Sequence, residues 1–241
     1  GGESLSLDRA LIASPLPNTA LPEAFPLTLL YEDEQLLVIN KPAGLIVHPG
    51  AGNPQHTLVN ALLFYHPQLQ HLPRAGLIHR LDKDTTGALL IAKTQTAYTA
   101  LSTQMRARQI QRQYVALVQG HLPLPYTLTT HFGRDPRNRL KMAVTAQGRE
   151  AITHYQALRC FQHFTLLHVT LLTGRTHQIR VHLTYIKHPI VGDPLYGKPL
   201  PLGRLDSPEL RSTLLSFSRQ ALHAETLSFM HPITHTPLTL Q

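Results

Sequence analysis

The sequence predicts an α+β fold around a mixed, largely antiparallel sheet with flanking helices. Short strand-like runs outnumber helical segments along the chain, and the regular alternation of strand and helix found in a wholly parallel sheet is not evident. A chain of 241 residues with 42% hydrophobic content is also long enough to bury a substantial core.

The periodicity of apolar residues places the individual elements. We expect strands at residues 27–31, 36–40, 87–93, 112–119, 151–158 and 164–172, where branched, alternating or continuous apolar side chains dominate. We expect helices at residues 57–65 and 176–186, and a third around Tyr98, Leu101 and Met105, which share one helical face. Thr94 is the expected N-cap of the helix around Leu101, and Thr176 that of the helix over 176–186.

The first 26 residues differ in composition from the rest of the chain. Residues 14–26 hold four prolines among small and apolar side chains, a composition typical of a linker. We therefore expect a proline-rich linker over 1–26 and one folded domain over 27–241. Because the chain starts at Gly1 and not at Met, we also expect a processing boundary there, with a further domain upstream.

The charge of the chain suits an anionic partner. The net charge is +8, and arginine carries most of it, with 16 Arg against 6 Lys. Planar guanidinium groups suit phosphates and stacked bases, although a basic composition alone is equally compatible with simple solubility.

Cysteine usage and hydropathy exclude several classes of protein. Cys160 is the only cysteine, which excludes a disulfide framework and a Cys-rich zinc site. We expect it to be a small buried side chain in a reducing compartment, in keeping with a cytoplasmic protein. No apolar run approaches the roughly 18 residues that span a membrane, and the first residues do not resemble a signal peptide.

The segment GLIHRLDKDTTG, residues 76–87, carries the first candidate site. We expect an apolar strand that ends at a charged turn, where backbone amides aim the Asp82 carboxylate into a cleft. Arg80, two residues away on an extended chain, shares its side of the backbone. Asp82 could equally bond local amides as an ordinary turn residue. A glycosidase pair with Asp84 is disfavoured, because the spacing is short for carboxyl groups that flank a substrate bond.

The segment TGRTHQIRVHL, residues 173–183, carries the second candidate site. We expect it to follow a strand and open a helix, where Arg175, His177 and Arg180 surround free backbone amides that attract anions. Arg180 is predicted to face the cleft and to pair with a buried carboxylate. His177 and His182 lie five residues apart, on different helical faces, which disfavours a metal site.

Two basic stretches point to a nucleic-acid backbone. Residues 131–142, HFGRDPRNRLKM, are predicted to form a mobile basic loop that contacts phosphates through Arg134, Arg137, Arg139 and Lys141. A second stretch of three basic residues precedes Tyr114 and consists of Arg106, Arg108 and Arg112. A solvated charged face is the usual interpretation of such runs, but few acidic residues are present here to form ion pairs. Tyr114 by itself is more typical of a core aromatic than of a stacking platform.

Taken together, these segments resemble the RluA/RluD family of pseudouridine synthases. HRLDKDTTG at residues 79–87 is similar to the family signature, and the other motifs occur in the family's order. They are NKPAGLIVHPGAGNP from Asn40, QRQYVAL around Tyr114, GREAITHY from Gly148, TGRTHQIRVH from Thr173, HPIVGDPLYG from His188 and RQALHA from Arg219. The likeness is greatest to RluD-type enzymes of the large ribosomal subunit, and Gln113 departs from the acidic residue that often precedes the family's tyrosine.

The resemblance implies a fold, an activity and a partner. It implies the pseudouridine synthase catalytic fold with a central cleft over 27–241, and an S4-like RNA-binding domain upstream, of which residues 1–26 are a remnant or a linker. It implies that specific uridines of 23S rRNA are flipped out and isomerised to pseudouridine by a cytoplasmic monomer, without metal, cofactor or membrane.

The resemblance also implies roles for individual residues. Asp82 is the catalytic carboxylate, as nucleophile or base, and Arg180 holds it ionised at a distance of roughly 2.7–3.2 Å. Tyr114 stacks on the uracil and helps to remove the final proton. Arg80 fills the space that the flipped nucleotide leaves, and Lys41 lines the cleft. The remaining residues expected to bind RNA are Arg134, Arg137, Arg139, Lys141, Arg175 and His177.

Two other functions remain open at this point. A non-catalytic RNA-binding or ribosome-assembly factor on the same fold is disfavoured because Asp82, Tyr114 and Arg180 are all present. An RNA glycosylase or hydrolase differs by releasing free uracil.

Overall fold

The computed structural model describes residues 20–241, apart from residues 51, 139 and 201. Most of the predicted linker, and Arg139, therefore lie outside the described residues. The strands are β1 (Leu29–Glu32), β2 (Leu36–Lys41), β3 (Thr86–Ala92), β4 (Gln111–Gln119), β5 (Tyr126–Arg134), β6 (Met142–Val144), β7 (Arg149–Cys160), β8 (Phe164–Leu171), β9 (Leu222–Met230) and β10 (Pro237–Leu240). The α-helices are α1 (Leu58–Tyr65), α2 (Gln95–Arg106), α3 (Gln178–Tyr185) and α4 (Pro208–Ser216). The 3-10 turns are η2 (Pro67–His71), η3 (Pro73–Gly76) and η4 (Leu202–Arg204).

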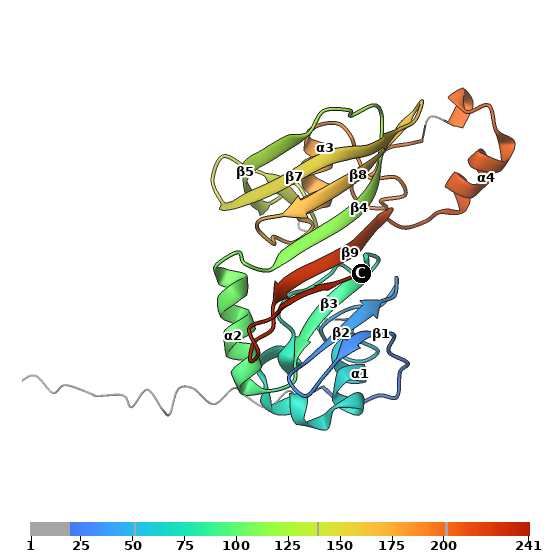
Figure 1. The fold of residues 1–241 in the computed structure, drawn as a ribbon. Coiled ribbons are helices and arrows are strands. Elements are labelled where there is room, and N and C mark those ends of the chain that lie inside the picture. The colour runs from blue at the N-terminus through green and yellow to red at the C-terminus, as the bar shows by residue number, and fades with distance from the viewer. Residues whose placement is uncertain (1–19, 51, 139, 201) are drawn as a thin grey trace, which may run out of the picture.

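One continuous sheet forms the frame of the molecule (Figure 1). Its strand order is β1-β2-β3-β9-β4-β8-β7-β5-β6, and β10 pairs with β9 off this path. Among the described strands the neighbours pair antiparallel, except that β3 and β9 run parallel. The predicted α+β fold with a mixed, largely antiparallel sheet is thus confirmed.

The parallel contact between β3 and β9 is short and divides the sheet into two halves. Figure 1 shows α1 and α2 against the β1–β3 half and α3 against the β4–β8 half, while α4 projects from the body. Gly87 lies in this contact at φ +113°, and a Cβ atom there would come within 2.1 Å of the Ala224 carbonyl oxygen. Only glycine allows the two backbones to approach this closely, which explains the glycine that ends the segment 76–87.

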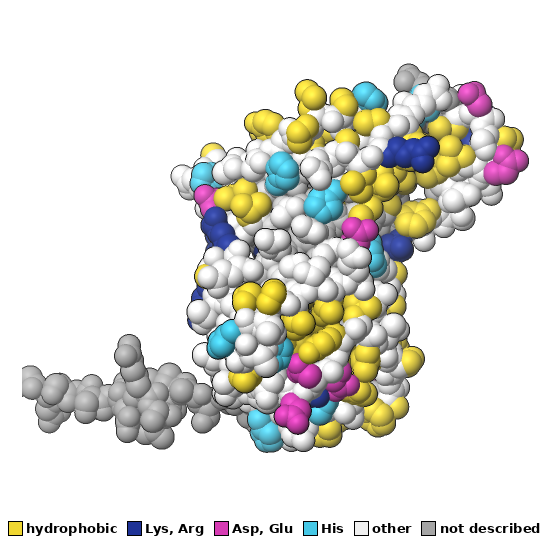
Figure 2. Space-filling view, viewed as in Figure 1, with side chains coloured by type: hydrophobic (Ala, Val, Ile, Leu, Met, Phe, Trp, Pro, Cys, Tyr) yellow, Lys and Arg dark blue, Asp and Glu magenta, His cyan; other side chains and the backbone are white. Residues whose placement is uncertain are grey.

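The largest hydrophobic core crosses the junction of the two halves. Leu89 of β3, Val169 of β8 and Ile179 of α3 all belong to it. On β4 every second side chain from Arg112 to Val118 is buried, so one face of this strand carries a charged residue and a tyrosine among apolar neighbours. On the face in Figure 2, by contrast, Lys and Arg side chains are few and separated.

The strands and helices expected from periodicity are confirmed, with ends that shift by at most two residues. Thr94 caps α2 as predicted, because its side chain accepts a hydrogen bond from the Ala97 amide at 3.2 Å. Within the described ranges, no helix has both the length and the apolar character required to cross a lipid bilayer.

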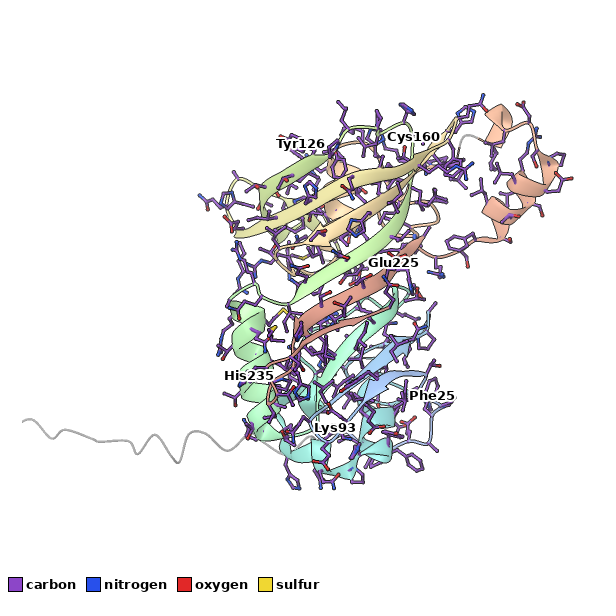
Figure 3. The ribbon with its side chains drawn as sticks, viewed as in Figure 1. Phe25, Lys93, Tyr126, Cys160, Glu225 and His235 are labelled. Carbon is purple, nitrogen blue, oxygen red and sulfur yellow. The ribbon has the colours of Figure 1, made fainter. Side chains whose placement is uncertain are left out.

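The expectation that Cys160 is buried was wrong. Its side chain is exposed at the end of β7, where the β7–β8 hairpin extends to the edge of the sheet (Figure 3). The inward alternation of β7 stops after Tyr155, and most side chains beyond it face solvent. An apolar residue type therefore does not predict burial where a strand extends beyond the hydrophobic core.

Candidate active site

Asp82 lies in a turn that leads into β3, and not at the end of a strand as predicted. The backbone before it makes only an isolated bridge, from the Ile78 amide to the Leu90 carbonyl at 3.1 Å. The Leu90 amide donates a hydrogen bond to His79 Nε2 at 3.2 Å, so this amide is not available to pair with another strand. The Thr85 amide donates to the Asp82 carbonyl at 3.1 Å and closes the turn that presents the carboxylate.

Lys41 stabilises this turn through buried hydrogen bonds. Its side chain is fully buried, and its ammonium donates to the carbonyls of Pro42, Leu45 and Lys83 at 2.8, 2.9 and 2.7 Å. Burial lowers the pKa of Lys41 to about 8, and the nearby carboxylates of Asp84 and Asp82 oppose that shift. Lys41 does not line the cavities around Asp82, so it holds the Asp82 turn and is not part of the cavity wall.

Arg180 joins the Asp82 turn to helix α3. Its Nη1 donates to Asp82 Oδ2 at 3.0 Å, within the range predicted from sequence, across 98 residues of chain. Its Nε and Nη2 donate to the two carboxylate oxygens of Asp193 at 2.7 and 2.9 Å. Burial alone would lower the pKa of Arg180, but Asp193 and then Asp82 raise it well above its usual value. The guanidinium is therefore a permanent cation shared by two carboxylates.

The loop before α3 is held by Gln178. Its side-chain oxygen accepts from the Thr173 hydroxyl at 2.8 Å and from the Arg175 amide at 2.9 Å. Because Gln178 closes the loop, the residue at the N-cap is His177, in a left-handed conformation at φ 58°. The prediction of Thr176 as N-cap was therefore wrong. A cap at Thr176 requires a helix that begins at His177, but α3 begins at Gln178.

His177 faces Asp82 from the start of α3. Its Nε2 lies 4.0 Å from Asp82 Oδ1, and its Nδ1 lies 2.9 Å from the hydroxyl of Tyr196. Tyr196 Oη accepts from the Met142 amide at 2.8 Å, so its own proton is available for His177 Nδ1. In the tautomer in which Tyr196 donates to Nδ1, the imidazole N–H is on Nε2, the ring nitrogen that lies toward Asp82. Burial lowers the pKa of His177, and the imidazole is neutral near pH 7.

Asp82 lies where two cavities meet. The larger has a volume of about 520 Å³, and the smaller, of about 420 Å³, shares Arg80, Leu81, Asp82, His177 and Arg180 with it. Seven arginines and one carboxylate, that of Asp82, are among the described residues that line the larger cavity. The arginines are Arg74, Arg80, Arg106, Arg108, Arg112, Arg175 and Arg180. The cavity therefore suits a polyanion that brings its own negative charge.

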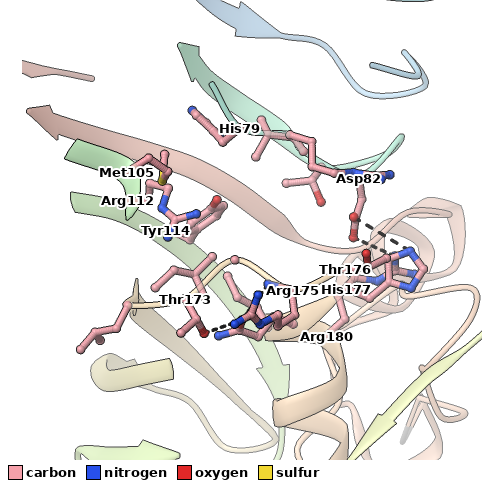
Figure 4. Close-up of a pocket in the computed structure, with 18 of the residues that line it drawn as sticks. His79, Asp82, Met105, Arg112, Tyr114, Thr173, Arg175, Thr176, His177 and Arg180 are labelled. Atoms are coloured by element: carbon pink, nitrogen blue, oxygen red, sulfur yellow. Dashed lines mark hydrogen bonds and ion pairs between the residues drawn. The ribbon is translucent and has the colours of Figure 1, made fainter. Parts of the chain in front are cut away.

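Tyr114 lines the larger cavity from strand β4 (Figure 4). The ring is 4% exposed, and no hydrogen bond joins its hydroxyl to any other described residue. Burial raises the pKa of Tyr114, which keeps the phenol protonated near neutral pH. Sequence alone left Tyr114 between a core residue and a stacking platform, and the structure places it in both settings, with its ring packed in the core and its edge in the cavity.

The other residues expected to bind RNA lie at different distances from this centre. Arg80 is exposed and lines both cavities, and Arg175 lines the larger one while its Nε donates to the Glu150 carbonyl at 2.9 Å. The basic loop predicted over 131–142 is shorter than expected, because residues 131–134 belong to β5 and Met142 to β6. The Asp135 amide donates to the Lys141 carbonyl at 3.0 Å and closes the turn between these strands. Lys141 lies 5.7 Å from the centre of the Tyr196 ring, which connects this turn to the site.

Three residues of the site were missed by sequence reasoning. Asp193, Tyr196 and Gln178 orient Arg180, His177 and the α3 loop, yet no hydrogen bond or ion pair joins these three residues to Asp82. Asp193 and Tyr196 both lie in the segment HPIVGDPLYG, which was recognised as a motif without a role. A buried arginine needs a carboxylate, and Asp193 is the acidic residue of that motif, so this signal could have found it.

The described residues do not offer a metal site. Among them no group of three or more His, Cys, Asp or Glu side chains converges as ligands. His182, considered with His177, is instead bound by the hydroxyls of Thr130 and Thr153 at 2.9 and 2.8 Å.

Known proteins resemble this chain both in sequence and in structure. A family model described as RNA pseudouridylate synthase matches residues 35–185. A curated protein of Xanthomonas campestris pv. campestris, named ribosomal large subunit pseudouridine synthase D, is 52% identical over 238 residues, which are 99% of this chain and 71% of that protein. The protein of the same name from Escherichia coli K12 is 49% identical over 214 residues, 88% of this chain and 65% of that protein.

Solved structures are similar over most of the described fold. Human RNA pseudouridylate synthase domain containing 4 has a TM-score of 0.68 and 28% identity, and covers 88% of this chain and 87% of that one. Human RNA pseudouridylate synthase domain containing 1 has a TM-score of 0.66 and 27% identity, and covers 89% and 82% respectively.

Proposed function

The chain belongs to the RNA pseudouridylate synthase family, and from that membership we propose that it converts uridines of large-subunit ribosomal RNA to pseudouridine at Asp82. The family makes it an isomerase. The names of the curated relatives from Xanthomonas and Escherichia supply the substrate class in this proposal.

The observation that carries the proposal is the ion-paired carboxylate in an arginine-lined cavity. Asp82 accepts from Arg180 at 3.0 Å, and its side chain is 16% exposed, so it remains open to a substrate. Arg180 is itself fixed by the fully buried Asp193 carboxylate. A fixed cation beside a carboxylate stabilises its ionised form and sets its direction, as a nucleophile or a base requires.

The reaction asks little more of the protein than this carboxylate. The N-glycosidic bond between N1 and C1′ breaks, the uracil turns, and a C–C bond forms between C5 of the base and C1′ of the ribose. C5 then loses its proton and N1 gains one, so there is no net oxidation or reduction. Asp82 acts on the ribose as the base departs, either by adding to C1′ or by removing a proton from C2′. Arg180 keeps Asp82 ionised for this step, and His177 presents its N–H to the other carboxylate oxygen.

Tyr114 and Arg80 act on the base and on the RNA around it. Tyr114 stacks on the uracil, and because burial raises the pKa of its phenol, it serves as a neutral surface and not as a phenolate base. The target atom is inaccessible in a stacked helix, so the uridine must be flipped out. Arg80, exposed at the edge of both cavities, is suited to fill the space that the nucleotide leaves.

The RNA backbone is held by basic side chains around the cavity. In this proposal Arg175 and His177 contact it at the mouth, and the turn between β5 and β6 contacts it through Arg134, Arg137, Arg139 and Lys141. Lys41 acts from beneath the catalytic turn. The protein works as a monomer in the cytoplasm, where ribosomal subunits are assembled.

The experiment is product analysis on large-subunit rRNA transcribed without modifications. The chain is incubated with this RNA, and nucleosides are resolved after complete digestion. We expect pseudouridine at a small number of positions and no free uracil. Free uracil would identify a glycosylase, and RNA binding with neither product would identify a non-catalytic binding factor.

A further inference from the structure

Arg112 of strand β4 is a buried cation without a counterion. Its side chain is 8% exposed and lies on the same inward face of β4 as Tyr114, two residues away. No hydrogen bond or ion pair joins its guanidinium to another described residue, and its Nε is buried without a partner. Buried guanidinium groups are normally paired, because removing an ion from water costs several kcal/mol.

Arg180, the ion-pair partner of Asp82, shows the counterions that Arg112 lacks. Arg180 has a similar burial but binds two carboxylates. Burial lowers the pKa of Arg112 below its usual value, and no carboxylate among the described residues raises it again, yet the guanidinium stays charged near pH 7. Nearby His79 adds no charge, because burial and Arg112 lower its pKa to about 3.

The surroundings of Arg112 leave room for an anion. Arg112 lines the larger cavity, and a Cβ atom on Gly174 would lie 2.6 Å from its Nη1. The absence of a side chain at Gly174 thus allows the guanidinium to extend beneath the loop before α3. Figure 4 shows Arg112 beside Tyr114, at a distance across the cavity from Asp82. An anion at Arg112 is therefore kept away from the catalytic carboxylate.

We propose that Arg112 binds a phosphate of the RNA strand that enters the larger cavity, and so supplies the missing counterion from the substrate. The inference rests on the proposed function for the identity of the RNA. A phosphate accepts from guanidinium donors in a bidentate manner, and the two terminal nitrogens of Arg112, which unlike Nε are not enclosed by protein, offer such a pair. The energy of burying Arg112 is thus recovered only when RNA is bound, which favours the bound geometry of the reacting nucleotide beside Tyr114.

The test compares Arg112→Met and Arg112→Lys with the wild-type chain. Arg159→Met is the matched control, because Arg159 is exposed on β7 and lines neither cavity. The probe is a stem–loop of large-subunit rRNA, and its Kd is measured over a series of salt concentrations. Binding and not turnover is measured, so a failure of the proposed activity leaves this result interpretable.

We expect Arg112→Met to weaken binding by about ten- to a hundredfold, as for one lost charge-assisted hydrogen bond. The slope of log K against log salt should fall in magnitude by about 0.7 to 0.9, and Arg112→Lys should restore it. The free Arg112→Met protein should unfold at the same or a higher temperature, because an unpaired buried charge has been removed. The control should keep the wild-type slope.

A second measurement separates a phosphate from a base. The stem–loop is prepared with a neutral methylphosphonate at one linkage at a time. One linkage should weaken wild-type binding, and Arg112→Met should be insensitive to that same linkage. The proposal is overturned if the wild-type chain does not bind the RNA, or if Arg112→Met keeps the wild-type slope. It also fails if Arg112→Met unfolds at a lower temperature and binds RNA as the wild type does, because Arg112 would then only support Tyr114. It fails as well if no methylphosphonate linkage distinguishes the two proteins, because Arg112 would then contact a base.

Discussion

Replacing Asp193 with Asn removes the charge that fixes Arg180. The Asp193 side chain has no exposed surface, and it accepts from Arg180 at 2.7 and 2.9 Å and from the Leu195 and Tyr196 amides at 2.9 Å each. Asn keeps one oxygen but turns an NH₂ group toward the guanidinium. Breaking one partner of a buried pair costs about 3–5 kcal/mol, and because Asp82 still binds Arg180 we expect the lower figure, about 3 kcal/mol.

Thermal and urea unfolding measure this loss. For a chain of this size, about 3 kcal/mol corresponds to a fall in Tm of roughly 6–12 °C. Burial alone would raise the pKa of Asp193, but Arg180 holds it below its usual 3.8, so the stabilisation is present above about pH 4 and is lost as pH falls through the lower folded pKa. The difference between wild type and Asp193→Asn should therefore be constant at neutral pH and shrink below pH 4.

Asp206→Asn provides the control, because Asp206 is exposed and the substitution is the same. We expect its Tm to match that of the wild-type chain. If Asp193→Asn unfolds within about 0.5 kcal/mol of wild type at pH 7, a spread typical of surface substitutions, the buried pair does not hold Arg180 and the reasoning is refuted.

Three further substitutions test the supports of the site. Arg180→Lys keeps the charge but loses the planar guanidinium. Single-turnover assays should show a loss of about a hundredfold in rate, with the Kd for RNA within threefold of wild type. An equal loss in rate and affinity would argue against a role of Arg180 in orienting Asp82. Lys41→Met leaves three buried or partly buried carbonyls without this donor, and urea unfolding should report about 2–3 kcal/mol less stability, whereas no change would show that the three contacts contribute nothing. Gly87→Ala places a Cβ 2.1 Å from the Ala224 carbonyl at φ +113°, and circular dichroism should show a loss of about 3 kcal/mol or more; a wild-type Tm would mean that β3 and β9 can separate there.

Local patterns predicted β1–β4, β7 and β8, where apolar runs or alternation mark the buried side chains, but β5, β6, β9, β10 and α4 were not predicted. β4 is an example, since its buried positions from Arg112 to Val118 are every second residue. The order of the strands was not predictable in this way, because β9 pairs with both β3 and β4 across more than a hundred residues of chain.

The contact of Asp82 with Arg180 was predictable because each lies in a recognisable motif, and chemistry requires them to meet. The second partner, Asp193, was not predicted because no local pattern shows which carboxylate a buried arginine will find. The N-cap of α3 failed for a similar reason. Intrinsic preference favoured Thr176, but the side chain of Gln178 ties the loop together and moves the start of the helix.

The most direct test of the account is the single-turnover rate of Asp82→Asn on large-subunit rRNA, measured beside its equilibrium affinity for the same RNA. Asn keeps the size and a hydrogen-bond acceptor for Arg180 but can neither add to the ribose nor take its proton. The account predicts a rate of pseudouridine formation lower by at least about 10⁴-fold, with Kd within threefold of wild type. Pseudouridine formation by Asp82→Asn near the wild-type rate would contradict it.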